Sequence, residues 1–101
     1  MFTITISNPG CFLVQVPDSA EDARAAQIAR LRGVKGVVLV SVQSTNPALL
    51  AVWVDSALGL KAKHDVFQRI VALYPANELV IRRQNGLRQL TDDELLKLFP
   101  F

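Results

Sequence analysis

His64 and Cys11 are the two side chains whose chemistry suits proton transfer or nucleophilic attack. His64 stands at helical spacing from Leu60 and Phe67, which places it at the border of an apolar stripe, where a histidine usually covers a core. Cys11 follows Gly10, with no neighbouring base and no helix start that would lower its pKa. No Ser-His-Asp or Cys-His arrangement can be assembled around either residue, so we expect no catalytic activity.

Metal and cofactor chemistry have little support in the composition. The chain has one cysteine and one histidine, too few for a cysteine-histidine zinc site or an internal disulfide. The carboxylates of Asp92 and Asp93 fall in the first turn of an expected helix, where they complement the helix dipole. We therefore expect no cofactor and no metal site.

Basic side chains flank an Asn-Gly pair in IRRQNGLRQL, residues 81–90. Asn-Gly favours a two-residue type I′ turn, because both central residues need positive φ. Such a turn places Arg83 opposite Arg88, and like charges that face each other across a ladder are destabilising. Either an acid such as Asp92 or Glu78, or a bound anion, would have to lie between them.

A phosphate-binding surface is the function that these basic residues would suit. Many of the other charges stand at expected helix ends, where the helix dipole accounts for them. Two lysines near the start of an expected helix oppose that preference and would attract an anion. The alternative function is therefore an anion or nucleic-acid binder that uses Arg82, Arg83, Arg88, Lys61 and Lys63.

Length and composition predict a single domain over residues 1–101. Half of the residues are apolar, 20% are charged and the formal net charge is +2, as in ordinary globular proteins. Residues 36–54 carry no charge, but polar residues interrupt their middle, where a membrane-spanning helix is most apolar. The N-terminal residues lack the basic and apolar regions of a secretory signal. We expect a soluble, cytoplasmic protein that does not associate with membranes.

The elements that position these residues alternate between strands and helices. Alternating or β-rich apolar runs predict strands, of which the first two form a hairpin. A high content of Ala, Arg and Glu predicts the first longer helix, and helical spacing of apolar residues predicts the second. A capping box of Thr91 and Glu94 opens a third, short helix. In chain order we expect strands at 2–7 and 11–16, a helix at 18–32, strands at 36–43 and 48–55, a helix at 60–74, strands at 79–83 and 87–90, and the short helix from 91.

Residues 12–83 contain the order βαββαβ, which predicts an α+β, ferredoxin-like sandwich with two helices on one face of an antiparallel sheet. An extra N-terminal strand, a C-terminal hairpin and a short terminal helix complete this expected fold. The passage LRGVKGVVLVSV, residues 31–42, resembles the passage from the first helix to the second strand in many ferredoxin-like modules, including heavy-metal-associated domains. The resemblance implies topology only, because PDSAED, residues 17–22, stands where the metal-binding family has its Cys-x-x-Cys pair.

Both faces of the expected sheet are apolar. Strand alternation places Val38 and Val40 on one face, and Leu39 and Trp53 on the other. Two helices cover one face only, so the second face needs the N-terminal strand, the tail LLKLFPF or another protein chain as its cover. We predict a protein-binding or self-associating module, with a protein partner or a second copy on this second face. Its expected anchors are Trp53, Leu39, Leu13, Leu49 and Phe99.

Overall fold

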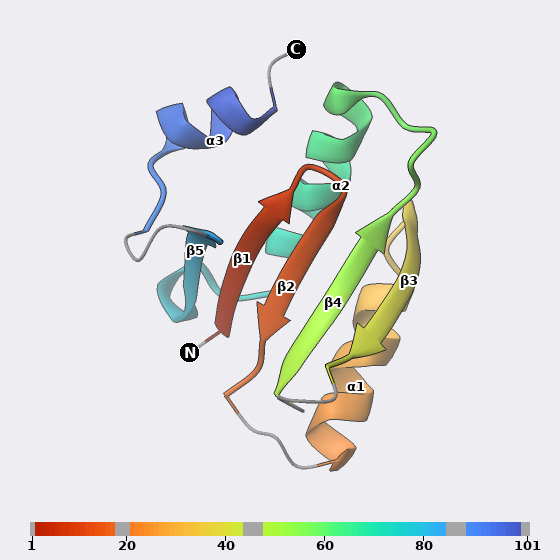
Figure 1. The fold of residues 1–101 in the computed structure, drawn as a ribbon. Coiled ribbons are helices and arrows are strands. Elements are labelled where there is room, and N and C mark those ends of the chain that lie inside the picture. Colours follow the sequence, from red (N-terminus) through yellow and green to blue (C-terminus); the bar gives the residue numbers. More distant parts are fainter. Residues whose placement is uncertain (1, 18–20, 44–47, 85–88, 100–101) are drawn as a thin grey trace.

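The protein is an α+β structure with one five-stranded sheet and three α-helices (Figure 1). A computed structural model describes residues 2–17, 21–43, 48–84 and 89–99. In chain order the elements are β1 (Phe2–Asn8), β2 (Cys11–Gln15), α1 (Glu21–Arg32), β3 (Val37–Val42), β4 (Leu49–Val54), α2 (Leu60–Val71), the 3₁₀ turn η1 (Ala76–Glu78), β5 (Leu79–Arg83) and α3 (Asp92–Leu98).

The sheet is mixed, with the strand order β3-β4-β2-β1-β5. β1 and β2 form the predicted hairpin, and β3 pairs with β4 as a second antiparallel hairpin. β1 then lies between β2 and β5 and runs parallel to β5. The expectation of a wholly antiparallel sheet is therefore wrong, and the ferredoxin-like strand order is not confirmed. The cause is a long-range pairing, Ile4 with Ile81, which local sequence patterns do not encode.

One face of the sheet packs against α1 and α2, which both lie behind the sheet in the view of Figure 1. Alternate strand residues point to this face, and α2 adds the buried side chains of Val66, Phe67 and Ile70. α1 adds fewer, because its apolar stripe is mostly alanine with Ile28 and Leu31. The shared core includes Ile4, Ile6, Phe12, Val14, Leu31, Leu50, Val52, Val66, Phe67 and Ile70.

The chain returns along β5 after the Asn-Gly segment. The backbone N–H of Leu90 donates to the carbonyl of Ile81 at 2.9 Å, as the predicted pairing requires, and Arg82 and Gln89 form an antiparallel bridge. Residues 89–90 form no strand beyond this single bridge, and the expected turn at 85–88 lies outside the described residues. The predicted capping box opens α3: Thr91 accepts from the backbone of Glu94, whose side chain accepts from Thr91.

Candidate functional site

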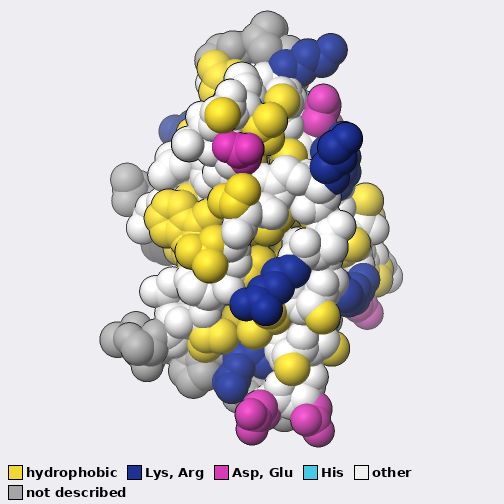
Figure 2. Space-filling model, turned by 90° about the vertical axis from the view of Figure 1, so that its right-hand side faces the viewer, with side chains coloured by type: hydrophobic (Ala, Val, Ile, Leu, Met, Phe, Trp, Pro, Cys, Tyr) yellow, Lys and Arg dark blue, Asp and Glu magenta, His cyan; other side chains and the backbone are white. Residues whose placement is uncertain are grey.

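Exposed apolar side chains gather on the edge strand β3 and its neighbour β4. The exposed fractions are 63% for Val38, 51% for Leu39, 43% for Trp53 and 41% for Val42. We call these four residues the β3 edge surface. Figure 2, which views the molecule from the β3 side, shows hydrophobic side chains grouped in the middle of this side with charged side chains around them.

A bulge in β3 decides which valine reaches the solvent. Val37 is opposite Val54, but Leu39 is opposite Trp53, so Val38 has no partner on β4. Strict alternation had placed Val38 on the face with Val40 and Val37 on the other. The extra residue brings Val37 to the helix-facing side opposite Val54 and leaves Val38 unpaired at the bulge. Val37 packs against the core, whereas Val38 is the most exposed of the large apolar side chains described.

The sheet face that points away from α1 and α2, here called the open face, is apolar over only part of its width. Across β2, β4 and β3, one row joins Cys11, Trp53 and Leu39. Leu13 and Leu49 lie half-buried on this face, and Ala51 is buried between them. β1 and β5 complete the face mainly with polar side chains, namely Thr3, Thr5, Ser7 and Arg82, beside the half-buried Val80. The prediction of an apolar second face therefore describes the β2, β4 and β3 part alone.

The two covers that the chain itself might have supplied lie elsewhere. β1 is a strand within the sheet, and the described part of the tail ends at Phe99, which is 1% exposed and packs on the helix side. The Phe99 ring stacks on Phe67 with centroids 5.6 Å apart and lies 6.4 Å from the ring of Phe12. Phe99 is therefore a core residue in this chain and does not belong to the surface that Trp53 and Leu39 share.

His64 and Cys11, the two residues whose chemistry suits proton transfer or nucleophilic attack, are half-buried and buried respectively. His64 is half-buried, with its ring edge-on to Phe99 at 5.1 Å and its Nε2 3.2 Å from Nε2 of Gln68. Cys11 is 4% exposed, and burial raises the pKa of its thiol, which opposes nucleophilic reactivity. Among the described residues, no group of three or more histidine, cysteine or acidic side chains is placed to hold a metal ion.

The basic residues of the alternative function are distributed over two elements. Arg82 and Arg83 are exposed neighbours at the end of β5, and strand alternation sends their side chains to opposite faces. Lys61 is exposed and Lys63 half-buried in the first turn of α2, which contains no acidic residue. Arg88, the predicted partner of Arg83, lies outside the described residues. The described basic residues thus form no single row or cluster along one element.

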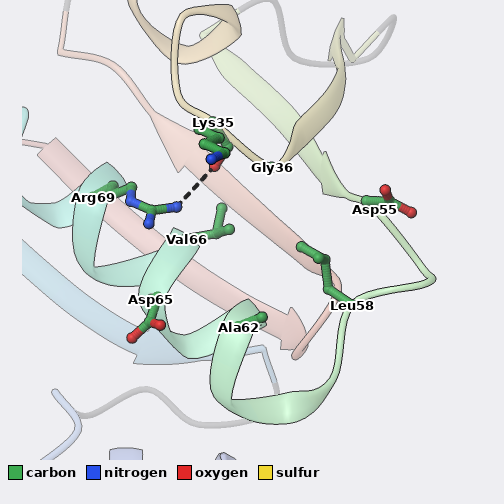
Figure 3. A pocket seen from close by; sticks show the side chains of 8 residues that line it. All are labelled: Lys35, Gly36, Asp55, Leu58, Ala62, Asp65, Val66 and Arg69. Atoms are coloured by element: carbon green, nitrogen blue, oxygen red, sulfur yellow. Dashed lines mark hydrogen bonds between the residues drawn. The ribbon is translucent and has the colours of Figure 1, made fainter.

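A groove of about 370 Å³ lies between α2, the turn before β3 and the loop after β4 (Figure 3). Its lining residues are Lys35, Gly36, Asp55, Leu58, Ala62, Asp65, Val66 and Arg69. Arg69 donates to the carbonyl of Lys35 at 3.2 Å, and the backbone N–H of Asp55 donates to the carbonyl of Gly36 at 3.0 Å. The four charged residues, two of each sign, are exposed or half-buried, so the groove offers solvated charges around an apolar floor.

Gly36 allows the turn beside this groove to approach α2. Its φ is +101°, and a Cβ built there would lie 2.4 Å from Cγ2 of Val66. Only glycine adopts this φ readily and leaves room for the valine. Sequence reasoning noted the Gly-Val-Lys-Gly passage for its topology and missed the groove, because the Val66 side of the contact comes from a distant element.

Comparison of the chain with family models, with curated proteins and with solved structures finds no match. No helix in the described parts of the chain has the length and apolar content needed to cross a bilayer. The candidate site is accordingly defined by the geometry of this chain, and the β3 edge surface is its most distinctive exposed feature.

Proposed function

We propose that this protein is a small, non-catalytic binding module that recognises protein through the β3 edge surface. The observation that carries the proposal is the group of four exposed apolar residues, Val38, Leu39, Val42 and Trp53, on adjacent strands. Exposed apolar residues occur singly on most proteins, whereas neighbouring ones commonly mark an interaction site. Leu39 and Trp53 are a cross-strand pair on the open face, and Val42 is on the helix-facing side of the same edge strand. The buried Cys11 beside Trp53 and the half-buried Leu13 extend the apolar floor from β4 onto β2.

Trp53 is the expected anchor of this contact. It lies opposite Leu39 on β3 and opposite Cys11 on β2, so its ring has apolar neighbours on both sides. Tryptophan is enriched among the residues that dominate binding energies, because its large ring buries much apolar surface with few rotatable bonds. Burial of apolar area contributes about 25 cal/mol per Å² before the costs of association are subtracted.

The test is a selection of phage-displayed random peptides on the immobilised protein, followed by affinity measurements with three proteins. Peptides that bind the wild type should bind Trp53→Asp at least tenfold more weakly. Leu96→Asp is the matched control, because Leu96 is a 54% exposed leucine on α3, away from β3. Equal loss in both variants, or peptide binding that ignores Trp53, would contradict the proposal.

Salt separates the proposal from the alternative of anion or nucleic-acid binding. Contacts to phosphate weaken steeply as salt rises from about 50 to about 500 mM, whereas apolar contacts do not. A fluorescent pool of mixed oligonucleotides that binds only at low salt, and that is lost with Arg82→Ala and Arg83→Ala, would move the function to the basic residues. Peptide binding that persists at both salt concentrations supports the β3 edge surface.

A further inference from the structure

The outer edge of β3 has hydrogen-bonding groups without a partner strand. The backbone N–H of Gln43 donates to the carbonyl of Leu49 at 3.1 Å. In an antiparallel ladder the bonded pairs alternate, so Ser41 also bonds to β4, whereas the backbone groups of Val40 and Val42 point away from it. β3 is the first strand in the sheet order, and no other described strand lies beyond it.

This edge has few of the features that prevent an edge strand from pairing with a strand of another chain. β3 reads VVLVSV, without a charged residue or a proline. Natural edge strands are commonly protected by lysine, proline, a bulge or a covering segment. The bulge at Val38 is the one such feature within β3, and it lies near the start of the strand. The regular part from Leu39 to Val42 is left available to pair with another strand.

We propose that the occupant of this edge is a second copy of the chain, whose β3 pairs antiparallel with β3 about a two-fold axis at Ser41. The proposal rests on the proposed function and names its partner. A two-fold contact of a strand with itself is necessarily antiparallel, and it sets each surface against its own copy. β3 suits such a contact because it has no charge that would face its own kind.

The pattern of free backbone groups selects this register. With the axis at Ser41, Val40 pairs with Val42 of the second copy, and Val42 pairs with its Val40. Both residues have outward backbone groups in the regular part of the strand, so both pairs exchange hydrogen bonds. An axis at Val40 would leave one regular hydrogen-bonded pair, that of Val40 with its own copy. The next hydrogen-bonded pairs would join Val42 to Val38, which is unpaired in the bulge.

Side chains fit the same arrangement. The exposed Val42 gains a valine neighbour on the helix-facing side, and Leu39 gains Gln43 of the second copy as its neighbour on the open face. Lys35, the charged residue that most closely precedes β3, lies at opposite ends of the interface in the two copies. One strand edge buries less than the roughly 1,200–2,000 Å² of a standard stable interface, so the dimer should dissociate on dilution.

The test is the molar mass in solution, measured by light scattering from about 1 µM to about 1 mM protein at two salt concentrations. The wild type should change from monomer to dimer over this range at both salts. Val42→Pro removes the outward N–H, which an edge strand tolerates, and should raise the dimer dissociation constant about thirtyfold, the equivalent of two backbone hydrogen bonds. Val42→Ala keeps the N–H and should weaken the dimer less.

Oxidative cross-linking tests the register without relying on the proline variant. Ser41→Cys places a thiol beside its own copy and should give a disulfide-linked dimer, whereas the wild type, whose one cysteine is buried, should not. A wild type that stays monomeric throughout, or a dimer that survives Val42→Pro while Ser41→Cys fails to cross-link, overturns the proposal. Peptide binding that still depends on Trp53 would then leave the proposed function standing with a different partner.

Discussion

Gly36→Ala is expected to destabilise the protein strongly, because two independent costs meet at this position. The φ of +101° is unfavourable for any residue with a Cβ, at about 1–2 kcal/mol. The added Cβ also lies 2.4 Å from Cγ2 of Val66, a core side chain that is 1% exposed. Relief of such overpacking typically costs about 1–3 kcal/mol. The lower entropy of the unfolded chain offsets about 0.4–1 kcal/mol, which leaves a loss of about 3 kcal/mol.

Urea unfolding measures this loss. A domain of this size is expected to unfold in one step, so the midpoint should fall while the slope stays constant. Gly59→Ala is the matched control: Gly59 has φ −71°, and a Cβ there meets no atom within 4 Å. The control should change stability by less than about 1 kcal/mol.

A double variant separates the two costs at Gly36. Val66→Ala removes the methyl group that the new Cβ would strike, at a cost of its own for the lost core contacts. The combined variant should therefore be less destabilised than the sum of the two single variants, by about the overpacking contribution. Gly36→Ala no more destabilising than Gly59→Ala, or strict additivity with Val66→Ala, would refute this account of the turn.

Four further predictions concern three buried side chains. The Tyr74 hydroxyl is buried without a hydrogen-bond partner among the described residues, so Tyr74→Phe should stabilise the protein by about 1 kcal/mol in thermal or urea unfolding. Burial raises the pKa of Tyr74 to about 12 from an ordinary 10.0, despite the opposing charge of Arg30, so the stability from the neutral phenol is complete below pH 10 and lost as pH rises towards 12. Ultraviolet titration reports this residue alone, since the chain has one tyrosine, and a midpoint near 10 in the folded protein would contradict the prediction. Phe99→Ala should cost about 3–5 kcal/mol in urea unfolding, as expected of a core aromatic, and a cost below 1 kcal/mol would show that the tail is not part of the core. The Cys11 thiol, with a pKa raised by burial, should react with an aromatic disulfide reagent far more slowly at pH 8 than the same thiol in urea, and equal rates would contradict its burial.

Local signals in the sequence were sufficient for most of the elements. Period-two alternation marked β1, runs rich in β-forming residues marked β3 and β4, and helical periodicity marked α2, whose buried residues are Val66, Phe67 and Ile70. The capping box of Thr91 and Glu94 marked the start of α3. These features depend on residues a few positions apart, so their physical causes are contained within short stretches of chain.

The candidate site was predicted in part. Trp53 and Leu39 were named as exposed anchors, and both are exposed neighbours on β4 and β3. Phe99 was placed with them because the tail is apolar, but an apolar residue has the same appearance in a core and at an interface. Val38 and Val42 were assigned to the covered face, because alternation cannot reveal a bulge or the free edge of a sheet.

The sequence by itself determined where strands and helices form, the hairpin pairings and the apolar character of β3, because these follow from periodicity, turn residues and capping. Only the tertiary structure decided that β1 lies between β2 and β5, that Phe99 stacks on Phe67, and that Gly36 lies against Val66. Each of these contacts joins distant segments, and its free energy depends on which surfaces remain unpaired after the local elements have formed. The same competition leaves β3 at the edge of the sheet, where its uncharged strand is available to a partner.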